Sequence, residues 1–117
     1  MNDRSEAAGV IEVSVPGPRL DAAAAPGFKA MASAAFSNQP RRALIDLSQV
    51  TFVDSTGLGV LVSLMKMMPS DGALAIVGAQ QAVRRLFQIT RLDSVLPLYA
   101  SREEALAALS TGETAAR

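Results

Sequence analysis

The chain has 117 residues, of which half are hydrophobic, with 11 basic and 11 acidic side chains and a formal net charge of zero. That length and composition suit one folded domain and exclude disorder along the whole chain. The balanced charge argues against a nucleic-acid binder, which normally carries a basic excess. Histidine and cysteine are absent, which excludes disulfides, common zinc sites, thiol nucleophiles and serine triads with an imidazole base.

The ends of the chain and its most apolar stretch indicate where the protein works. Residues 55–68 are too short and too mixed with polar side chains to span a membrane. Residues 1–9 carry charges and no apolar block, unlike a secretory signal. We therefore expect a cytoplasmic protein without a membrane segment, with a domain at 10–109 between flexible ends at 1–9 and 110–117.

The first half of the chain predicts a strand, a helix and a buried strand. Residues 10–15 alternate in polarity, as in a half-exposed strand, and Pro16-Gly17-Pro18 ends it. The apolar positions that follow share one helical face: Phe28, Met31, Ala32, Ala35 and Phe36. Residues 43–47 form an apolar run, interrupted by Asp46, that is typical of a strand covered on both faces.

The second half continues the alternation. The expected elements are a short strand at 50–53, a helix up to residue 68, a buried strand at 73–77, a helix around 83–90, a short strand at 95–99 and a helix at 103–109 capped by Ser101. Parallel strands need helical crossovers, so this order predicts an α/β domain. We expect a mostly parallel or mixed sheet of about four to five strands with about four helices.

The segment Asp54-Ser55-Thr56-Gly57 lies where a strand passes into a helix. Asp54 or Ser55 could simply cap that helix, since both are preferred N-cap residues. Gly57 and Gly59 in the first turns each cost roughly 1 kcal/mol relative to alanine. Either the helix packs very close to its own sheet, or another protein approaches this end.

The same helix is apolar on two sides. One stripe, expected to face the core, consists of Leu58, Leu61, Val62 and Met65. The neighbouring face is small and nearly uncharged, and consists of Gly59, Val60, Ser63 and Met67. It is either buried within the domain or a contact surface for a partner.

Residues 44–61, which read LIDLSQVTFVDSTGLGVL, resemble the signature of STAS-domain anti-sigma factor antagonists. Gly78 with residues 82–93 is similar to the third helix and following turn of that family. Arg19-Leu20-Asp21 with the helix of Phe28 resembles its first crossover. The resemblance covers about residues 10–109.

The resemblance implies a switch in which the unphosphorylated protein binds an anti-sigma factor that is also an ATP-dependent serine kinase, and thereby frees a sigma factor. The kinase then phosphorylates the serine that follows the aspartate, here Ser55, with Thr56 as second choice, and the antagonist lets go. A metal-dependent phosphatase reverses the modification. ATP belongs to the kinase, so we expect no cofactor or metal in this chain, no enzymatic activity, and a monomer or weak dimer.

The expected partner-binding residues are Asp21, Asp46, Asp54, Ser55, Thr56, Gly57, Gly59, Val60, Ser63 and Met67. For Asp21 and Asp46, capping of local backbone groups is an equally simple interpretation. Arg84 and Arg85 are interpreted as surface charges, with a contact to the partner as the alternative.

The sequence departs from the family in three places. The loop Pro16-Gly17-Pro18 before Asp21 differs from the usual spacing, one strand rather than two is expected before Asp21, and Arg91 stands where a turn usually has glycine. The alternative function is a STAS adaptor subunit, not phosphorylated, in a transporter or stress-signalling complex. An enzyme with Ser55 as nucleophile is disfavoured because histidine and a Gly-x-Ser-x-Gly elbow are missing.

Overall fold

The computed structural model describes residues 4–7, 9–38 and 40–111. Its strands are β1 (Arg4–Ala7), β2 (Val10–Ser14), β3 (Arg19–Leu20), β4 (Arg42–Asp46), β5 (Phe52–Val53), β6 (Ala73–Val77) and β7 (Leu98–Tyr99). Its α-helices are α1 (Ala25–Phe36), α2 (Ser55–Met67), α3 (Gln81–Ile89) and α4 (Arg102–Thr111), with a 3₁₀ turn at Leu92–Ser94. No helix in these ranges is long and apolar enough to cross a bilayer.

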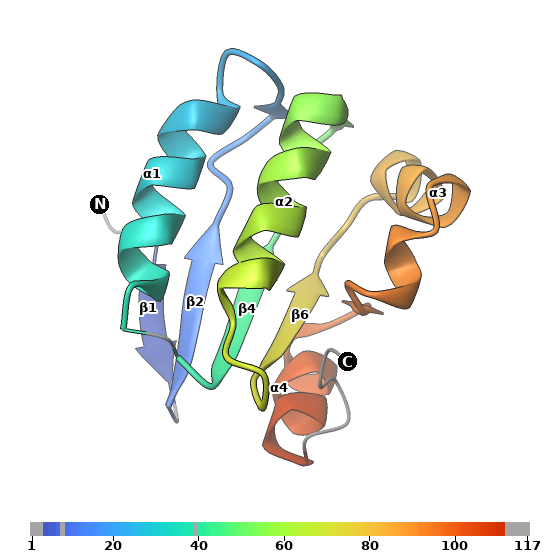
Figure 1. The fold of residues 1–117 in the computed structure, drawn as a ribbon. Helices are drawn as coiled ribbons and strands as arrows, with labels where there is room; N and C mark the ends of the chain where they lie inside the picture. Colours follow the sequence, from blue (N-terminus) through green and yellow to red (C-terminus); the bar gives the residue numbers. More distant parts are fainter. Residues whose placement is uncertain (1–3, 8, 39, 112–117) are drawn as a thin grey trace.

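The main sheet has five strands in the order β1-β2-β4-β6-β7 (Figure 1). β2, β4, β6 and β7 are parallel to one another, and β1 is antiparallel to β2. A second sheet consists of β3 and β5, which are parallel. The predicted α/β class is thus confirmed, with helical crossovers between the parallel strands.

Residues 4–7, within the segment expected to be flexible, form a strand, which corrects the expectation of a single strand before Asp21. Arg4–Ala7 pairs with β2, with Ala7 opposite Val10, so the two strands form a tight hairpin. Gly9 in this turn has φ +80°, which glycine adopts without strain. The sequence Arg-Ser-Glu-Ala shows no apolar alternation, so backbone pairing along β2 defines this strand. The expected flexible tail lies mostly outside the described residues.

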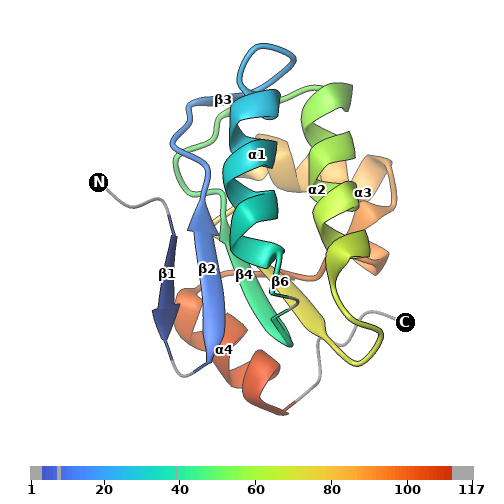
Figure 2. The same cartoon turned by 60° about the vertical axis from the view of Figure 1, so that its left-hand side comes forward.

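The helices form two layers on the sheet. Figures 1 and 2 show α1 and α2 side by side over one face, with α4 on the opposite side. The larger core lies under α1, α2 and α3 and includes Val13 and Val15 of the first predicted strand and Phe87 of α3. The smaller core joins Ala105 and Leu109 of α4 to the other face of the sheet. Central strands are therefore covered on both sides, as their apolar runs predict.

The region from the end of α3 to α4 agrees with its predicted cap and turn. Ser101 precedes α4, and its Oγ accepts a hydrogen bond from the Glu104 N–H at 3.1 Å. Arg102 then forms an ion pair with Glu12 of β2 that fixes the helix to the sheet. Arg91 has φ +62°, the left-handed conformation that glycine usually supplies, so its effect is confined to the turn after α3. The expected strand at 95–99 shortens to Leu98–Tyr99.

Candidate functional site

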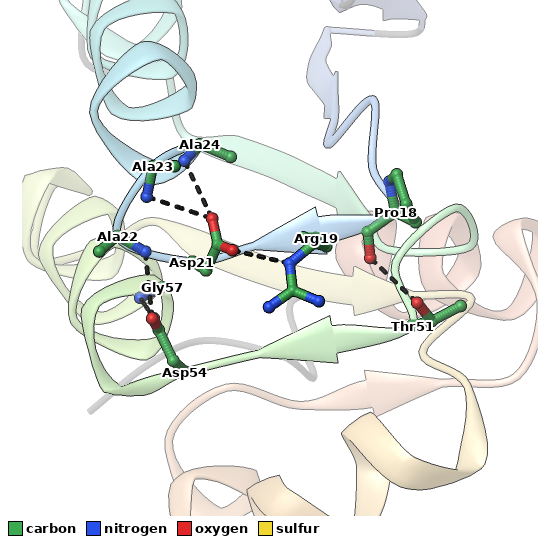
Figure 3. Close-up of polar contacts among 9 residues, drawn as sticks. All are labelled: Pro18, Arg19, Asp21, Ala22, Ala23, Ala24, Thr51, Asp54 and Gly57. Carbon is green, nitrogen blue, oxygen red and sulfur yellow. Dashed lines mark hydrogen bonds and ion pairs between the residues drawn. The ribbon is translucent and has the colours of Figure 1, made fainter.

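Asp54 builds the start of α2 and connects it to the loop before α1. Its Oδ1 accepts a hydrogen bond from the Gly57 N–H at 2.9 Å, which makes it the N-cap. Its Oδ2 accepts from the Ala22 N–H at 3.1 Å, from a loop that is 32 positions away in the chain (Figure 3). One carboxylate therefore holds two separate segments together at the carboxyl ends of β3 and β5.

Ser55 and Thr56 are the first two residues of α2, and both are exposed. Because Asp54 caps the helix, the Ser55 hydroxyl is not needed for that purpose. Within the described part of the chain, neither the Ser55 nor the Thr56 hydroxyl takes part in a hydrogen bond. The site thus presents two uncommitted hydroxyl groups at the tip of a helix that is already capped.

The two glycines of α2 have different surroundings. Gly57 is buried, and a Cβ atom there would lie 2.1 Å from the Leu20 carbonyl oxygen of β3. Close packing of α2 against β3 within the domain therefore explains the glycine at position 57. Gly59 is exposed, and a Cβ there would meet nothing within 4 Å. No packing within the described residues requires this second glycine.

The faces of α2 differ from the prediction by a rotation of the helix. The buried residues are Gly57, Val60, Leu61 and Leu64, whereas the other expected core positions, Leu58, Val62 and Met65, are half-buried. Val60, expected on the contact face, is only 7% exposed and belongs to the core. The shift follows from the contact of Gly57 with β3, which turns its own side of the helix inward.

Fewer residues of the expected contact face are exposed than predicted. Ser63 is half-buried, and its hydroxyl donates to the Val60 carbonyl oxygen at 2.8 Å. Met67 is also half-buried and packs against the core. Gly59 is thus the only fully exposed residue of the four, and the accessible surface lies at the first turns of α2.

Asp21 lies beside this surface and caps its own loop. Its Oδ1 accepts from the Ala23 and Ala24 N–H groups at 3.2 and 3.1 Å, and its Oδ2 accepts from Arg19 Nε at 2.8 Å. The Arg19 hydrogen bond, supported by the Ala24 N–H, lowers the pKa of the Asp21 carboxyl group below its ordinary value. Because Asp54 binds Ala22, the structure brings Asp21 and Asp54 to the same corner.

Asp46 has a different position from the other two carboxylates. It ends β4, and its Oδ1 accepts from the Ser48 N–H at 2.8 Å. A Cβ on Gly78 would lie 3.1 Å from the same oxygen, so this carboxylate faces the turn after β6. Of the two interpretations, the structure supports capping of the strand end, and no hydrogen bond joins Asp46 to the start of α2.

Sequence reasoning missed an aromatic and cationic pair at this edge. The Arg19 guanidinium carbon lies 4.4 Å from the centroid of the Phe52 ring, and the ring is 42% exposed. The pair exists because β3 aligns with β5 in a two-residue ladder, with Arg19 opposite Phe52. Strands of two residues are too short to show a periodic pattern in the sequence. The one available signal was Phe52 itself, an aromatic residue two positions before Asp54.

The unusual loop before Asp21 is packed against the turn that precedes β5. The Pro18 carbonyl oxygen accepts from the Thr51 N–H at 2.7 Å and the Phe52 N–H at 3.3 Å. A Cβ on Gly17 would lie 2.3 Å from the Gln49 carbonyl oxygen, so this position needs glycine. The two arginines of α3, Arg84 and Arg85, are exposed, as expected of surface charges.

Comparisons with known proteins agree with this architecture. The STAS domain family model matches residues 3–105. A Thermotoga neapolitana protein named as an anti-sigma factor antagonist homologue is 33% identical over 98 residues, 82% of this chain and 87% of its own. The anti-sigma-B factor antagonist of Staphylococcus aureus is 33% identical over 86 residues, 73% of this chain and 79% of its own.

A solved structure extends the agreement to three dimensions. The crystal structure of an anti-sigma factor antagonist from Mycobacterium paratuberculosis superposes with a TM-score of 0.85 at 32% identity, and covers 92% of this chain and 91% of that one. These relatives have regulatory rather than enzymatic names. With nearly the whole domain matched in sequence and in fold, the chain belongs to the STAS-domain family of the anti-sigma factor antagonists.

Proposed function

We propose that this protein is an anti-sigma factor antagonist that is switched off by phosphorylation of Ser55. In its unphosphorylated form it binds an anti-sigma factor with serine kinase activity, and that binding releases a sigma factor. The observation that carries the proposal is the Ser55 hydroxyl, which is exposed and makes no hydrogen bond to any described residue, because Asp54 caps the helix in its place. Thr56, exposed beside it, is the second candidate acceptor.

The chemistry divides between the two proteins. The Ser55 oxygen attacks the γ-phosphorus of ATP held by the kinase, an O–P bond forms, the bond to the β-phosphate oxygen breaks, and ADP leaves. Both oxygens of the neighbouring Asp54 already accept backbone N–H bonds. The proposal assigns the base that takes the hydroxyl proton to the kinase, because Asp54 is held in its capping position by these two bonds. A metal-dependent phosphatase hydrolyses the phosphoserine and resets the switch.

The phosphoryl group changes the docking surface without refolding the domain. It adds roughly 1.5 to 2 negative charges at a helix N-terminus, which tolerates an anion. A partner seated over the exposed Gly59 and the uncharged hydroxyls would instead meet bulk and charge. A penalty of about 2.8 kcal/mol weakens binding 100-fold, so a modest mismatch is enough for release.

The direct test is labelling by the cognate anti-sigma kinase with radioactive ATP. We expect phosphate in the wild type and in Thr56→Ala, and none in Ser55→Ala. Because the Ser55 hydroxyl makes no hydrogen bond within the part of the chain that the structure describes, Ser55→Ala should unfold at the same urea concentration as the wild type, which separates loss of the acceptor from loss of fold. Undiminished label in Ser55→Ala would show that another residue accepts the phosphate.

Binding tests the switch itself. Phosphorylated protein should lose at least about 100-fold in affinity for the kinase, in line with the penalty above. Equal affinity of both forms would contradict the switch. Recovery of a transporter subunit and no kinase in affinity capture would favour the adaptor function instead.

A further inference from the structure

Arg19 carries a guanidinium group that is only partly used. Its Nε donates to Asp21 Oδ2 at 2.8 Å, and its planar group lies over the Phe52 ring. Arginine has five N–H donors, and four of them belong to the two terminal nitrogens. Within the described residues, neither terminal nitrogen of Arg19 makes a hydrogen bond, and the side chain is 58% exposed. A fork of unpaired donors therefore lies at the surface of this corner.

The fork lies beside the start of α2 because residues 19–22 run alongside residues 52–55. Arg19 is opposite Phe52 and Leu20 is opposite Val53 in the ladder. Beyond it, the Asp54 N–H donates to the Leu20 carbonyl oxygen at 3.3 Å. In Figure 3 the Arg19 side chain extends from its own segment toward the segment that ends at Asp54. The residue after that is Ser55.

A phosphate on Ser55 would need a counter-charge here. It would sit beside Asp54, with Asp21 at the same corner, and these carboxylates repel it. α2 has no basic residue near its start, since its basic residue, Lys66, lies in the last turn. A guanidinium fork matches a phosphate with two parallel hydrogen bonds, and Arg19 is the cation that the hydrogen bonds of this corner already hold next to Asp21.

We propose that Arg19 binds the phosphate of phosphorylated Ser55, an inference that rests on the proposed function. Asp21 makes this exchange possible, because its Oδ1 alone accepts from the Ala23 and Ala24 N–H groups. Arg19 can leave Asp21 Oδ2 and the Phe52 ring without undoing the loop. Phosphorylation then removes the Arg19–Phe52 stack from the docking surface and holds the phosphate against the chain itself.

The test uses full-length protein with phosphoserine installed at position 55 during synthesis, so that no kinase is needed. The second pKa of the phosphate is measured by ³¹P NMR titration. A nearby cation favours the dianion, so we expect that pKa to be lower by about 1 with Arg19 present than in Arg19→Gln. Arg19→Lys keeps the charge without the planar fork and should fall between the two.

Controls come from the other charged groups around the site. Asp21 and Asp54 remain in every variant, α1 contributes Lys29, and α3, which packs near β5, contributes Arg84 and Arg85. Lys29→Gln and Arg85→Gln should leave the phosphate pKa unchanged. An equal pKa with and without Arg19, or an equal shift in Arg85→Gln, would overturn the role of Arg19. Absence of label on Ser55 in the kinase assay would instead overturn the proposed function.

Discussion

The two glycines of α2 offer a matched pair of substitutions in one helix. In Gly57→Ala, the new Cβ would lie 2.1 Å from the Leu20 oxygen and 3.0 Å from the Leu20 carbonyl carbon. Ordinary van der Waals contact begins at 3.4 Å, so the helix and β3 must separate by over an ångström. Overpacking of this kind costs about 1 to 3 kcal/mol, and alanine gains roughly 1 kcal/mol by helix propensity, so the substitution should lower the free energy of unfolding by up to about 2 kcal/mol.

Separation of α2 from β3 would also stretch the hydrogen bonds of the site. The Asp54 N–H donates to the same Leu20 oxygen, and Asp54 Oδ2 holds the Ala22 N–H. Gly57→Ala should therefore lower the free energy of unfolding and displace the start of α2 together. Urea unfolding measures the first effect, and amide chemical shifts of Ala22 and Ser55 measure the second.

Gly59→Ala is the control, because its Cβ would meet nothing within 4 Å at an exposed position. We expect a gain of about 0.5 to 1 kcal/mol, which for a chain of this length is a rise in Tm of about 4 °C at most. If partner approach is the reason for this glycine, the same variant should bind the anti-sigma factor more weakly although it is more stable. A Gly57→Ala protein as stable as the wild type would refute the packing argument.

Two further predictions concern the loop and the last helix. Because Arg19 lowers the pKa of Asp21 in the folded protein, its carboxylate stabilises the fold above the ordinary aspartate range, and this contribution is lost as the pH falls through the lowered value. Asp21→Asn should therefore be less stable than the wild type at pH 7, with a difference that shrinks below about pH 4. A difference that stays constant with pH would contradict the ion pair. Ser101→Ala should lower the free energy of unfolding in urea by about 1 kcal/mol, because the cap on the Glu104 N–H is lost. Ser110→Ala is the control and should cost much less, because the Ser110 hydroxyl only donates to the Ala107 carbonyl oxygen. Equal losses in the two variants would contradict the cap.

Strong local signals explain what the sequence could predict. The apolar runs at β4 and β6 and the helical spacing around Phe28 and Phe87 each match one period, so the class and order of the elements followed directly. The caps at Asp54 and Ser101 are equally local, since each acts on an N–H three residues ahead. The turn at Arg91 was placed by the resemblance to the family, in which glycine usually occupies this position, and the left-handed φ of Arg91 agrees with it.

Interactions between distant segments explain what the sequence could not predict. β1 has no periodic pattern and exists through backbone pairing with β2. The rotation of α2 depends on the contact of Gly57 with Leu20, 37 positions earlier, and it moved Val60 into the core. The place of Asp46 depends on Ser48 and Gly78, so no spacing rule could choose between its two interpretations.

The same contacts argue for the kind of switch this domain can be. The start of α2 is fixed twice, by the Asp54 carboxylate on two backbone N–H groups and by the fit of Gly57 against the Leu20 carbonyl. A segment held in this way cannot shift its register or unwind without losing both. The Ser55 hydroxyl, in contrast, points to solvent without a partner among the described residues. A fixed start of α2 with an exposed Ser55 hydroxyl favours regulation through surface charge and through the exchange of Arg19 between Asp21 and the phosphate. We therefore predict nearly equal backbone structures for the phosphorylated and unphosphorylated protein.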